Sequence, residues 1–182
     1  MQVAETERLR LRRLGADDSE FIFELVNDPS WIRYIGDKGV KTLGDATRYI
    51  VDGPVAMYRR LGFGLYLVEL KETREPIGIC GLIKREALED VDLGFAFLPS
   101  FWGRGYAREA ASTVMSHATC VLGLSRIVAI LSQDNDRSAN LLEKLGFHPE
   151  GTVVLQSNDE KLKLYAIALS APQPDARPGS SA

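Results

Sequence analysis

The chain has 182 residues, of which 45% are hydrophobic and 26% are charged, the balance of an ordinary soluble globular protein. At about 150 residues per domain, this length predicts a single domain, here over residues 1–170. The net charge of −3 argues against non-specific nucleic-acid binding, which needs a basic face. No apolar run reaches the roughly 18 residues of a membrane span, and the first residues form no apolar signal segment. We therefore expect neither a nucleic-acid partner nor a membrane partner.

Cysteine and histidine are sparse. Cys80 and Cys120 lie far apart in sequence without a CxxC motif, and the two histidines, His117 and His148, are also distant from each other. Zinc sites need closely spaced ligand pairs, so we expect no metal. Two unpaired thiols and no signal segment favour the cytoplasm.

The first half of the chain predicts a strand followed by two helices. Leucine and arginine alternate in the opening strand, as in a half-buried strand. The first helix begins with a capping-box pattern and ends before a proline. Residues 29–41 show no period and are predicted to be a loop. The predicted elements are a strand at 7–12, a helix at 17–28, and a helix at 42–61 that is interrupted at Gly53-Pro54.

The second half predicts a meander of three strands, then alternating helices and strands. Glycine closes the later, short helix at Gly146. Residues 171–182 hold Pro, Gly, Ser and Asp without an apolar period and are predicted to be a flexible tail. The predicted strands cover 63–70, 77–83, 91–98, 126–131, 152–156 and 162–169, with helices after Gly105 and from about Asn135. This order indicates an α+β or α/β domain.

The third strand of the meander has two unlike faces. One face carries Val91 and then leucine and phenylalanine residues, whereas the other holds only Asp92, Gly94 and Ala96. A nearly bare strand face often has a ligand or another backbone packed against it. We therefore place Asp92 among the candidate functional residues.

A glycine-containing loop connects this strand to the next helix. Gly103 and Gly105 leave backbone N–H groups free to converge on one point, and the helix N-terminus adds a partial positive charge. The loop suits a pyrophosphate, although a tight turn would also need glycine. It is not a P-loop, because no GxxxxGK[ST] occurs, nor a dinucleotide fingerprint, because Arg108 stands where the third glycine belongs.

Three ordered segments together resemble the GNAT superfamily of acyl-CoA N-acyltransferases. They are ETERLRLRRL (5–14), DLGFAFLPSFWGRGYARE (92–109) and NDRSANLLEKLGF (135–147). Within the superfamily, the chain resembles the branch that includes ribosomal-protein N-terminal (alanine/serine) acetyltransferases. The resemblance covers about residues 5–169. It implies a mixed, mostly antiparallel sheet of about seven strands, flanked by helices, whose central strands splay to form the acyl-CoA cleft.

The resemblance also implies the residues that bind acetyl-CoA. In the family, a loop of the form Q/R-x-x-G-x-G/A binds the pyrophosphate through backbone N–H groups, and the pantetheine arm pairs with the preceding strand. Trp102 stands where much of the superfamily has Gln or Arg, which is usual for this branch. The implied binding residues are Phe97 and Leu98 on the strand, Trp102, Gly103, Arg104, Gly105, Tyr106 and Ala107 in the loop, and Asn135 and Ser138 at the later helix.

Catalysis in this family is a direct attack of an amine on the thioester, which calls for a base, an oxyanion donor and an acid for the departing thiolate. Asp92 matches an acidic position common in the branch and is the candidate base, with Glu109 as the weaker alternative. Many relatives carry a tyrosine as the acid where this chain has Leu142, which has no proton to donate. Ser138 aligns with a serine proposed for that role in the branch.

The acceptor is expected to be a primary amine, first of all the N-terminus of a protein or peptide. An α-amine with a pKa of about 7.7–8.0 needs about 1–1.4 kcal/mol for deprotonation at pH 7, against roughly 4–5 kcal/mol for a lysine. A site with one base suits the α-amine better. Trp31 and Tyr34 are candidates for the acceptor pocket, or they fill the core instead.

Other readings of the sequence remain open at this point. A small amine such as a polyamine, amino sugar or drug is the alternative acceptor. A non-catalytic acyl-CoA-binding module would explain the missing tyrosine at Leu142, and a nucleotide-binding regulator would explain the glycine loop alone. The chain is expected to be a monomer or a homodimer.

Overall fold

The computed structural model describes residues 1–155 and 160–170, and its framework is one eight-stranded sheet. The strands lie in the order β1-β2-β3-β4-β5-β6-β8-β7. Every neighbouring pair is antiparallel except β5 and β6. The strands are β1 (Gln2–Glu5), β2 (Leu9–Arg13), β3 (Leu65–Leu70), β4 (Pro76–Ile83), β5 (Val91–Phe97), β6 (Arg126–Leu131), β7 (His148–Val154) and β8 (Lys161–Ala168). The expected mixed, mostly antiparallel sheet is confirmed, with one strand more than the seven expected.

The extra strand is β1, which the sequence did not reveal because residues 2–5 lack apolar alternation. Its pairing with β2 shifts register between Gln2 and Ala4, an irregularity that blurs a period of two. The start of β7 was also predicted too late, at residue 152. There a register shift between Pro149 and Gly151 hides the alternation in the same way.

The helices lie on both sides of the sheet. They are α1 (Ser19–Asn27), α2 (Pro29–Tyr34), α3 (Leu43–Ile50), α4 (Ala56–Leu61), α5 (Tyr106–Cys120) and α6 (Asp136–Lys144). A π-helical stretch at Val51–Val55 contains Pro54 and joins α3 to α4, so the predicted interruption is a change of helix type rather than a break.

Helix α2 contradicts the prediction that residues 29–41 form a loop. Asp28-Pro29 ends α1 as expected, but the same pair also starts α2. Asp28 is the N-cap, its carboxylate accepts a hydrogen bond from the Ser30 N–H (2.8 Å), and Pro29 occupies the first helical position. Six residues are too few to show a helical period, which explains the error.

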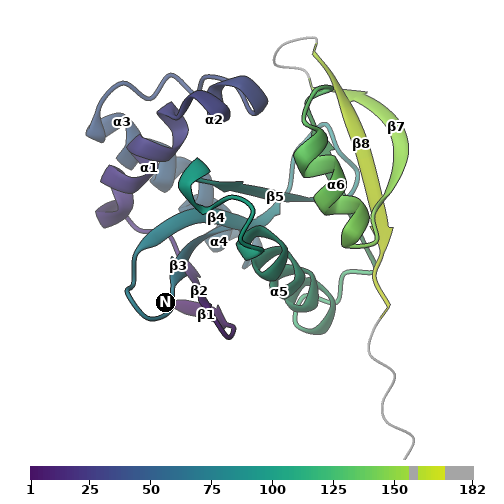
Figure 1. Ribbon diagram of the computed structural model, residues 1–182, viewed down its shortest axis with the longest axis horizontal. Helices are drawn as coiled ribbons and strands as arrows, with labels where there is room; N and C mark the ends of the chain where they lie inside the picture. The colour runs from purple at the N-terminus through teal and green to yellow at the C-terminus, as the bar shows by residue number, and fades with distance from the viewer. Residues whose placement is uncertain (156–159, 171–182) are drawn as a thin grey trace, which may run out of the picture.

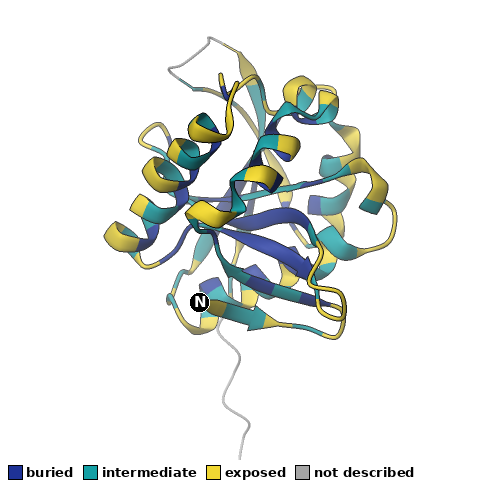
Figure 2. Cartoon of the chain, turned by 90° about the vertical axis from the view of Figure 1, so that its left-hand side faces the viewer, coloured by how far each residue is buried: buried dark blue, intermediate teal, exposed yellow. Residues whose placement is uncertain are grey.

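Two apolar cores cover the two faces of the sheet. On one face, α5 packs through a narrow stripe of small residues onto β4 and β5; this stripe is Ala110, Ala111, Val114 and Ala118. On the other face, α1, α2 and α3 bury their apolar residues against Leu67 and Ile79. Figure 1 shows α1, α2 and α3 gathered on one side and α6 with β7 and β8 on the other, with β5 running between them. Figure 2 shows the buried strands inside and the exposed residues on the outer helix surfaces.

The sheet opens at the parallel pair of β5 and β6. Strands β5 and β6 are in register only at Val91 with Ile127 and at Asp92 with Val128. Beyond Asp92, the edge of β5 that faces β6 has no strand partner within the described residues. This splay leaves backbone groups of β5 exposed along a cleft, as the GNAT resemblance implied.

The predicted tail at 171–182 lies outside the described residues. Among the helices of residues 1–155 and 160–170, none is long and apolar enough to cross a membrane. The same residues contain no cluster of three or more His, Cys, Asp or Glu side chains that could hold a metal ion.

Candidate active site

A cleft of about 1190 Å³ runs along the splay of β5 and β6. One wall comes from α2, α3 and the π-helical stretch, and the other comes from β6 and α6. The glycine loop and the first turn of α5 close one end. We call the part beside the glycine loop and α6 the donor end, and the part beside α2 and α3 the acceptor end.

The glycine loop has the backbone that the sequence predicted. Gly103 (φ 75°) and Gly105 (φ 83°) both adopt the left-handed conformation that other residues avoid. The N–H groups of residues 103–108 donate no hydrogen bond to any other group in the described part of the chain. Six unpaired donors at the start of a 15-residue helix form an anion-binding site suited to a pyrophosphate.

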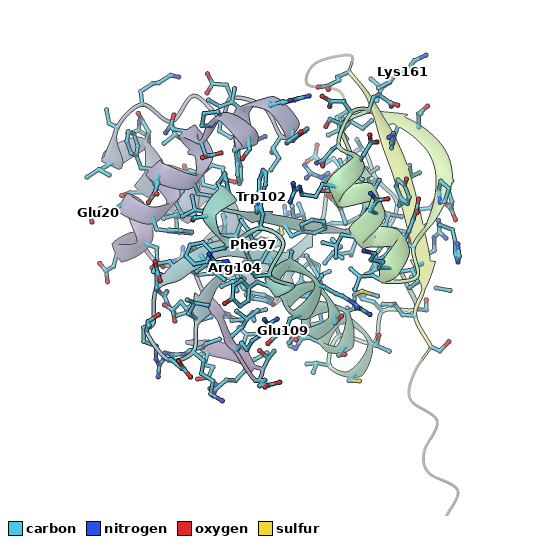
Figure 3. All side chains as sticks on the ribbon, in the orientation of Figure 1. Glu20, Phe97, Trp102, Arg104, Glu109 and Lys161 are labelled. Atoms are coloured by element: carbon cyan, nitrogen blue, oxygen red, sulfur yellow. The ribbon has the colours of Figure 1, made fainter. Side chains whose placement is uncertain are left out.

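Two side chains hold this loop in place. The Trp102 indole N–H donates to the Phe97 carbonyl at 2.8 Å, which ties the loop to the end of β5. From the other side, Arg8 Nη1 donates to the Arg104 carbonyl at 3.0 Å and stacks its guanidinium on Tyr106. In Figure 3, Phe97, Trp102 and Arg104 lie together at the centre of the molecule, whereas Glu20 and Lys161 lie at its edges.

Most of the predicted cofactor-binding residues line the cleft. They are Phe97, Trp102, Gly103, Gly105, Tyr106, Ala107, Asn135 and Ser138. Leu98 does not line it, because its N–H donates to the Ile77 carbonyl and its side chain packs on the core beneath α1 and α3. The Arg104 side chain also lies outside the cleft lining and rests over Phe101.

The start of α6 forms the opposite wall of the donor end. Asn135 caps this helix, since its side-chain oxygen accepts the Ser138 N–H at 3.1 Å. Arg137 lies over the Trp102 ring at 4.6 Å and so joins this wall to the glycine loop. Leu142 is fully buried in the core and does not line the cleft.

Asp92 is buried rather than solvated, with 1% of its surface exposed. Its Oδ2 accepts a hydrogen bond from Arg85 Nε at 2.7 Å, while Oδ1 is buried without a hydrogen-bond partner in the described chain. Burial raises the pKa of Asp92, and the attraction of Arg85 opposes that rise. A carboxylate of raised pKa that lines a cleft is a good candidate for a general base.

Glu109, the alternative base, has a carboxylate that is already held by hydrogen bonds to neighbouring residues. Its carboxylate accepts hydrogen bonds from the Thr6 hydroxyl (2.5 Å) and the Arg8 side chain (2.7 Å), and it does not line the cleft. Burial would raise the pKa of Glu109, but these hydrogen bonds outweigh it and hold the pKa below its usual value. Glu109 therefore fastens the β1–β2 turn to α5.

Trp31 and Tyr34 both line the acceptor end, and their role in binding the acceptor stays a prediction. Trp31 is also part of the core between α1 and α3, and its indole N–H is buried without a hydrogen-bond partner in the described chain. Next to Tyr34, Arg33 forms an exposed ion pair with Asp134 (2.9 Å), which links α2 to the residue before the α6 cap.

Comparison with known proteins identifies the family. The family described as Acetyltransferase (GNAT) domain matches residues 8–148. The chain belongs to the GNAT family of acetyltransferases. It is 32% identical to the uncharacterized N-acetyltransferase YoaA of Bacillus subtilis over 152 residues, which are 83% of this chain and 85% of that protein.

Two solved structures resemble this GNAT acetyltransferase along nearly their whole length. An acetyltransferase from Agrobacterium tumefaciens is 28% identical, with a TM-score of 0.77, over 92% of this chain and 94% of that chain. The ribosomal L7/L12 alpha-N-protein acetyltransferase RimL, in complex with coenzyme A, has a TM-score of 0.80 over 94% of this chain and 100% of that chain. Its 19% identity establishes the shared fold alone.

The cleft lining of this GNAT acetyltransferase includes polar residues that were not predicted from the sequence, among them Arg85, Ser132 and Lys38. Arg85 follows β4 and reaches Asp92 across the β4–β5 turn. Ser132 follows β6, and its hydroxyl is buried without a hydrogen-bond partner in the described chain. Its place just after a short buried strand is a usable signal, because strand ends often border ligand sites in α/β sheets.

Proposed function

We propose that this acetyltransferase moves the acetyl group of acetyl-CoA onto a primary α-amine, the N-terminus of a peptide or protein, by direct attack. The observation that carries the proposal is one continuous cleft with an anion-binding loop at one end and the buried carboxylate of Asp92 between β5 and β6.

The donor end fits acetyl-CoA as a substrate. The open N–H groups of 103–108 suit the pyrophosphate, and Arg108 on α5 and Arg137 and Lys144 on α6 add positive charge to the donor end. The free edge of β5 beyond Asp92 offers backbone groups for the pantetheine amides. Since Leu98 N–H and Phe97 C=O are already engaged, we assign that pairing to residues 93–96.

The chemistry needs two protons to leave the nitrogen of the acceptor ammonium, one of which ends on the sulfur. In the proposed reaction, Asp92 Oδ1 takes a proton from the acceptor ammonium, the amine nitrogen bonds to the thioester carbon, and the carbon–sulfur bond breaks. Backbone N–H groups on the free edge of β5 stabilise the oxyanion. The second proton of the amine nitrogen reaches the sulfur through Ser138, whose hydroxyl gives its proton to the departing thiolate and takes the proton of the nitrogen in its place.

The choice of an α-amine rests on the strength of this base. Asp92 keeps its ion pair with Arg85, and that cation limits how far the pKa of the carboxyl can rise. A modest base favours an amine whose pKa is near neutral over a lysine side chain. A small amine remains the second candidate, because a spermidine N(1)-acetyltransferase of Escherichia coli is 26% identical over 80% of this chain.

Ser138→Ala tests the acid. Without the hydroxyl, kcat should fall about tenfold while the KM for acetyl-CoA changes little, since proton transfer contributes to the transition state alone. The matched variant Ser132→Ala removes the other cleft hydroxyl. Steady-state thiol release measures kcat and KM for both variants. A drop for Ser132→Ala only would transfer the role to Ser132, and no drop for either would rule out a serine acid.

The acceptor class is tested with one peptide in two forms. The peptide has a free N-terminus and one internal lysine, and the control is the same peptide with its α-amine already acetylated. We expect thiol release with the free peptide only, and mass spectrometry should place the new acetyl group on the α-amine. Acetylation of the lysine, or faster turnover with spermidine, would refute the α-amine proposal. Tight acetyl-CoA binding with no turnover on any amine would indicate a binding module instead.

A further inference from the structure

The acceptor end of the cleft has an unusual set of unsatisfied polar groups. Arg85 uses only Nε on Asp92, so its two Nη groups donate no hydrogen bond in the described part of the chain. Lys38 has no hydrogen bond or ion pair among the described residues, and the buried Trp31 indole N–H is unpartnered there too. All three side chains line the cleft, and all three are donors.

Of the carboxylates that line the cleft within the described residues, only Asp92 is bonded to one of these side chains. Asp45 completes the capping box of α3 and pairs with Arg48, and Asp92 accepts a hydrogen bond from Nε of Arg85. Asp52 lies on the π-helical stretch and is exposed. The surrounding protein and the Arg85 guanidinium lower the pKa of Lys38, and no carboxylate contributes a compensating rise. Lys38 and the Nη groups of Arg85 therefore lie near each other in the cleft, and within the described residues the one carboxylate bonded to either is Asp92, through Arg85 Nε.

A buried donor without a partner is costly, and native proteins keep one where a ligand completes the hydrogen bond. The Trp31 indole N–H is such a donor, whereas Arg85 is partly exposed and Lys38 is exposed, so both can reach a ligand in the cleft. Beside them, Asp92 Oδ1 is the buried acceptor that the proposed function assigns to the amine. The acceptor end thus offers one carboxylate oxygen for a cation and several N–H donors, two of them charged, for an anion. That combination fits a molecule carrying an amine and a carboxylate close together.

We propose that the acceptor bears a carboxylate next to its reactive amine, and that Lys38 and the Nη groups of Arg85 bind it. This inference rests on the proposed function, since it takes Asp92 as the group that receives the amine. The carboxylate belongs either to the first or second residue of an acidic peptide N-terminus or to a free α-amino acid. The same pair of cations disfavours a polyamine.

The test compares acceptors that differ only in the carboxylate. The first arm uses peptides that begin with Glu or Gln, or that carry Glu or Gln second. The second arm uses a free amino acid and its amide, and spermidine is the cationic control. In one of the two arms, we expect kcat/KM to be at least tenfold higher for the acceptor with the carboxylate than for the matching amide. The arm that shows this preference tells whether the carboxylate belongs to a peptide or to a free amino acid.

Lys38→Met should bring this acid-to-amide ratio close to one, and Lys38→Glu should invert it. The matched control is Lys41→Met on the same segment. Lys41 is exposed, pairs with Asp37 and does not line the cleft, so both rates should stay unchanged. Acetyl-CoA affinity, measured calorimetrically for each variant, reports whether the donor end is intact.

The outcomes separate the two proposals. Equal rates for acid and amide at the α-amine would overturn the carboxylate inference and leave the α-amine proposal standing. A wild-type preference that survives in Lys38→Met would overturn the role of Lys38. Preferred acetylation of spermidine or of a lysine side chain would overturn both.

Discussion

Gly105→Asp is expected to weaken acetyl-CoA binding by at least about 100-fold, which corresponds to about 2.7 kcal/mol. Gly105 adopts φ 83°, and its N–H is one of the open donors that converge at the head of α5. A side chain there strains the backbone, its Cβ would lie 3.3 Å from Arg8 Nη2, and its carboxylate would add negative charge close to the proposed site of the doubly charged pyrophosphate. Calorimetric titration with acetyl-CoA measures the loss.

The control for this variant is Gly123→Asp. Gly123 is exposed after α5, also adopts a left-handed conformation (φ 66°), and has no atom within 4 Å of an added Cβ. It therefore carries the same backbone penalty far from the cleft. We expect comparable thermal stability for both variants and native acetyl-CoA affinity for Gly123→Asp. Native affinity in Gly105→Asp would mean that the loop does not bind the pyrophosphate.

Asp92→Asn is expected to lower kcat/KM for an α-amine acceptor by about 100-fold near pH 6, the effect of losing a general base. Burial raises the pKa of Asp92, so the wild-type rate should begin to fall at a higher pH than an ordinary carboxylate would cause. As the pH drops through that pKa, the carboxyl gains a proton and no longer accepts one from the ammonium.

The variant should have a different acidic limb. Without a base, the enzyme must wait for acceptor molecules that are already deprotonated, and their pKa is about 7.7–8.0. The limb of the pH–rate profile should therefore move up to that range, and the difference from wild type should shrink at high pH. Initial rates from pH 5 to 9 test this.

The control for Asp92 is Asp52→Asn, which removes an exposed carboxylate from the same cleft. Asparagine at 92 still offers Arg85 an oxygen acceptor, and a thermal melt reports any loss of stability from the broken ion pair. An unchanged pH–rate profile in Asp92→Asn would exclude Asp92 as the base. A shifted limb in Asp52→Asn would show that the effect is merely electrostatic.

Local patterns made the core of this fold predictable. The strands from 65 to 97 show apolar alternation or short apolar runs. Gly103 and Gly105 adopt a left-handed backbone conformation that favours glycine, so these two residues mark the loop in the sequence. Each signal is contained in a few neighbouring residues. The same holds for the Asn135 cap, which bonds three residues ahead.

The parts that were missed depend on contacts across the chain. The alternation along β5 correctly grouped Asp92 with Gly94 and Ala96 on one face of the strand. The burial of Asp92, however, depends on β6 and on Arg85, which lies across the β4–β5 turn. Similarly, Arg8 reaches Glu109 and the glycine loop from about 100 positions away in sequence. Leu98 was misplaced because its N–H is satisfied by β4 and not by a ligand.

The supports of the glycine loop have an entropic consequence. Trp102 and Arg8 hold the loop through its neighbouring carbonyls and leave its N–H groups open. The conformational entropy of fixing this segment is thus lost when the protein folds, and little remains to be lost when acetyl-CoA arrives. The affinity of the loop for a diphosphate should consequently appear as favourable enthalpy, without the ordering penalty of a loop that folds around its ligand.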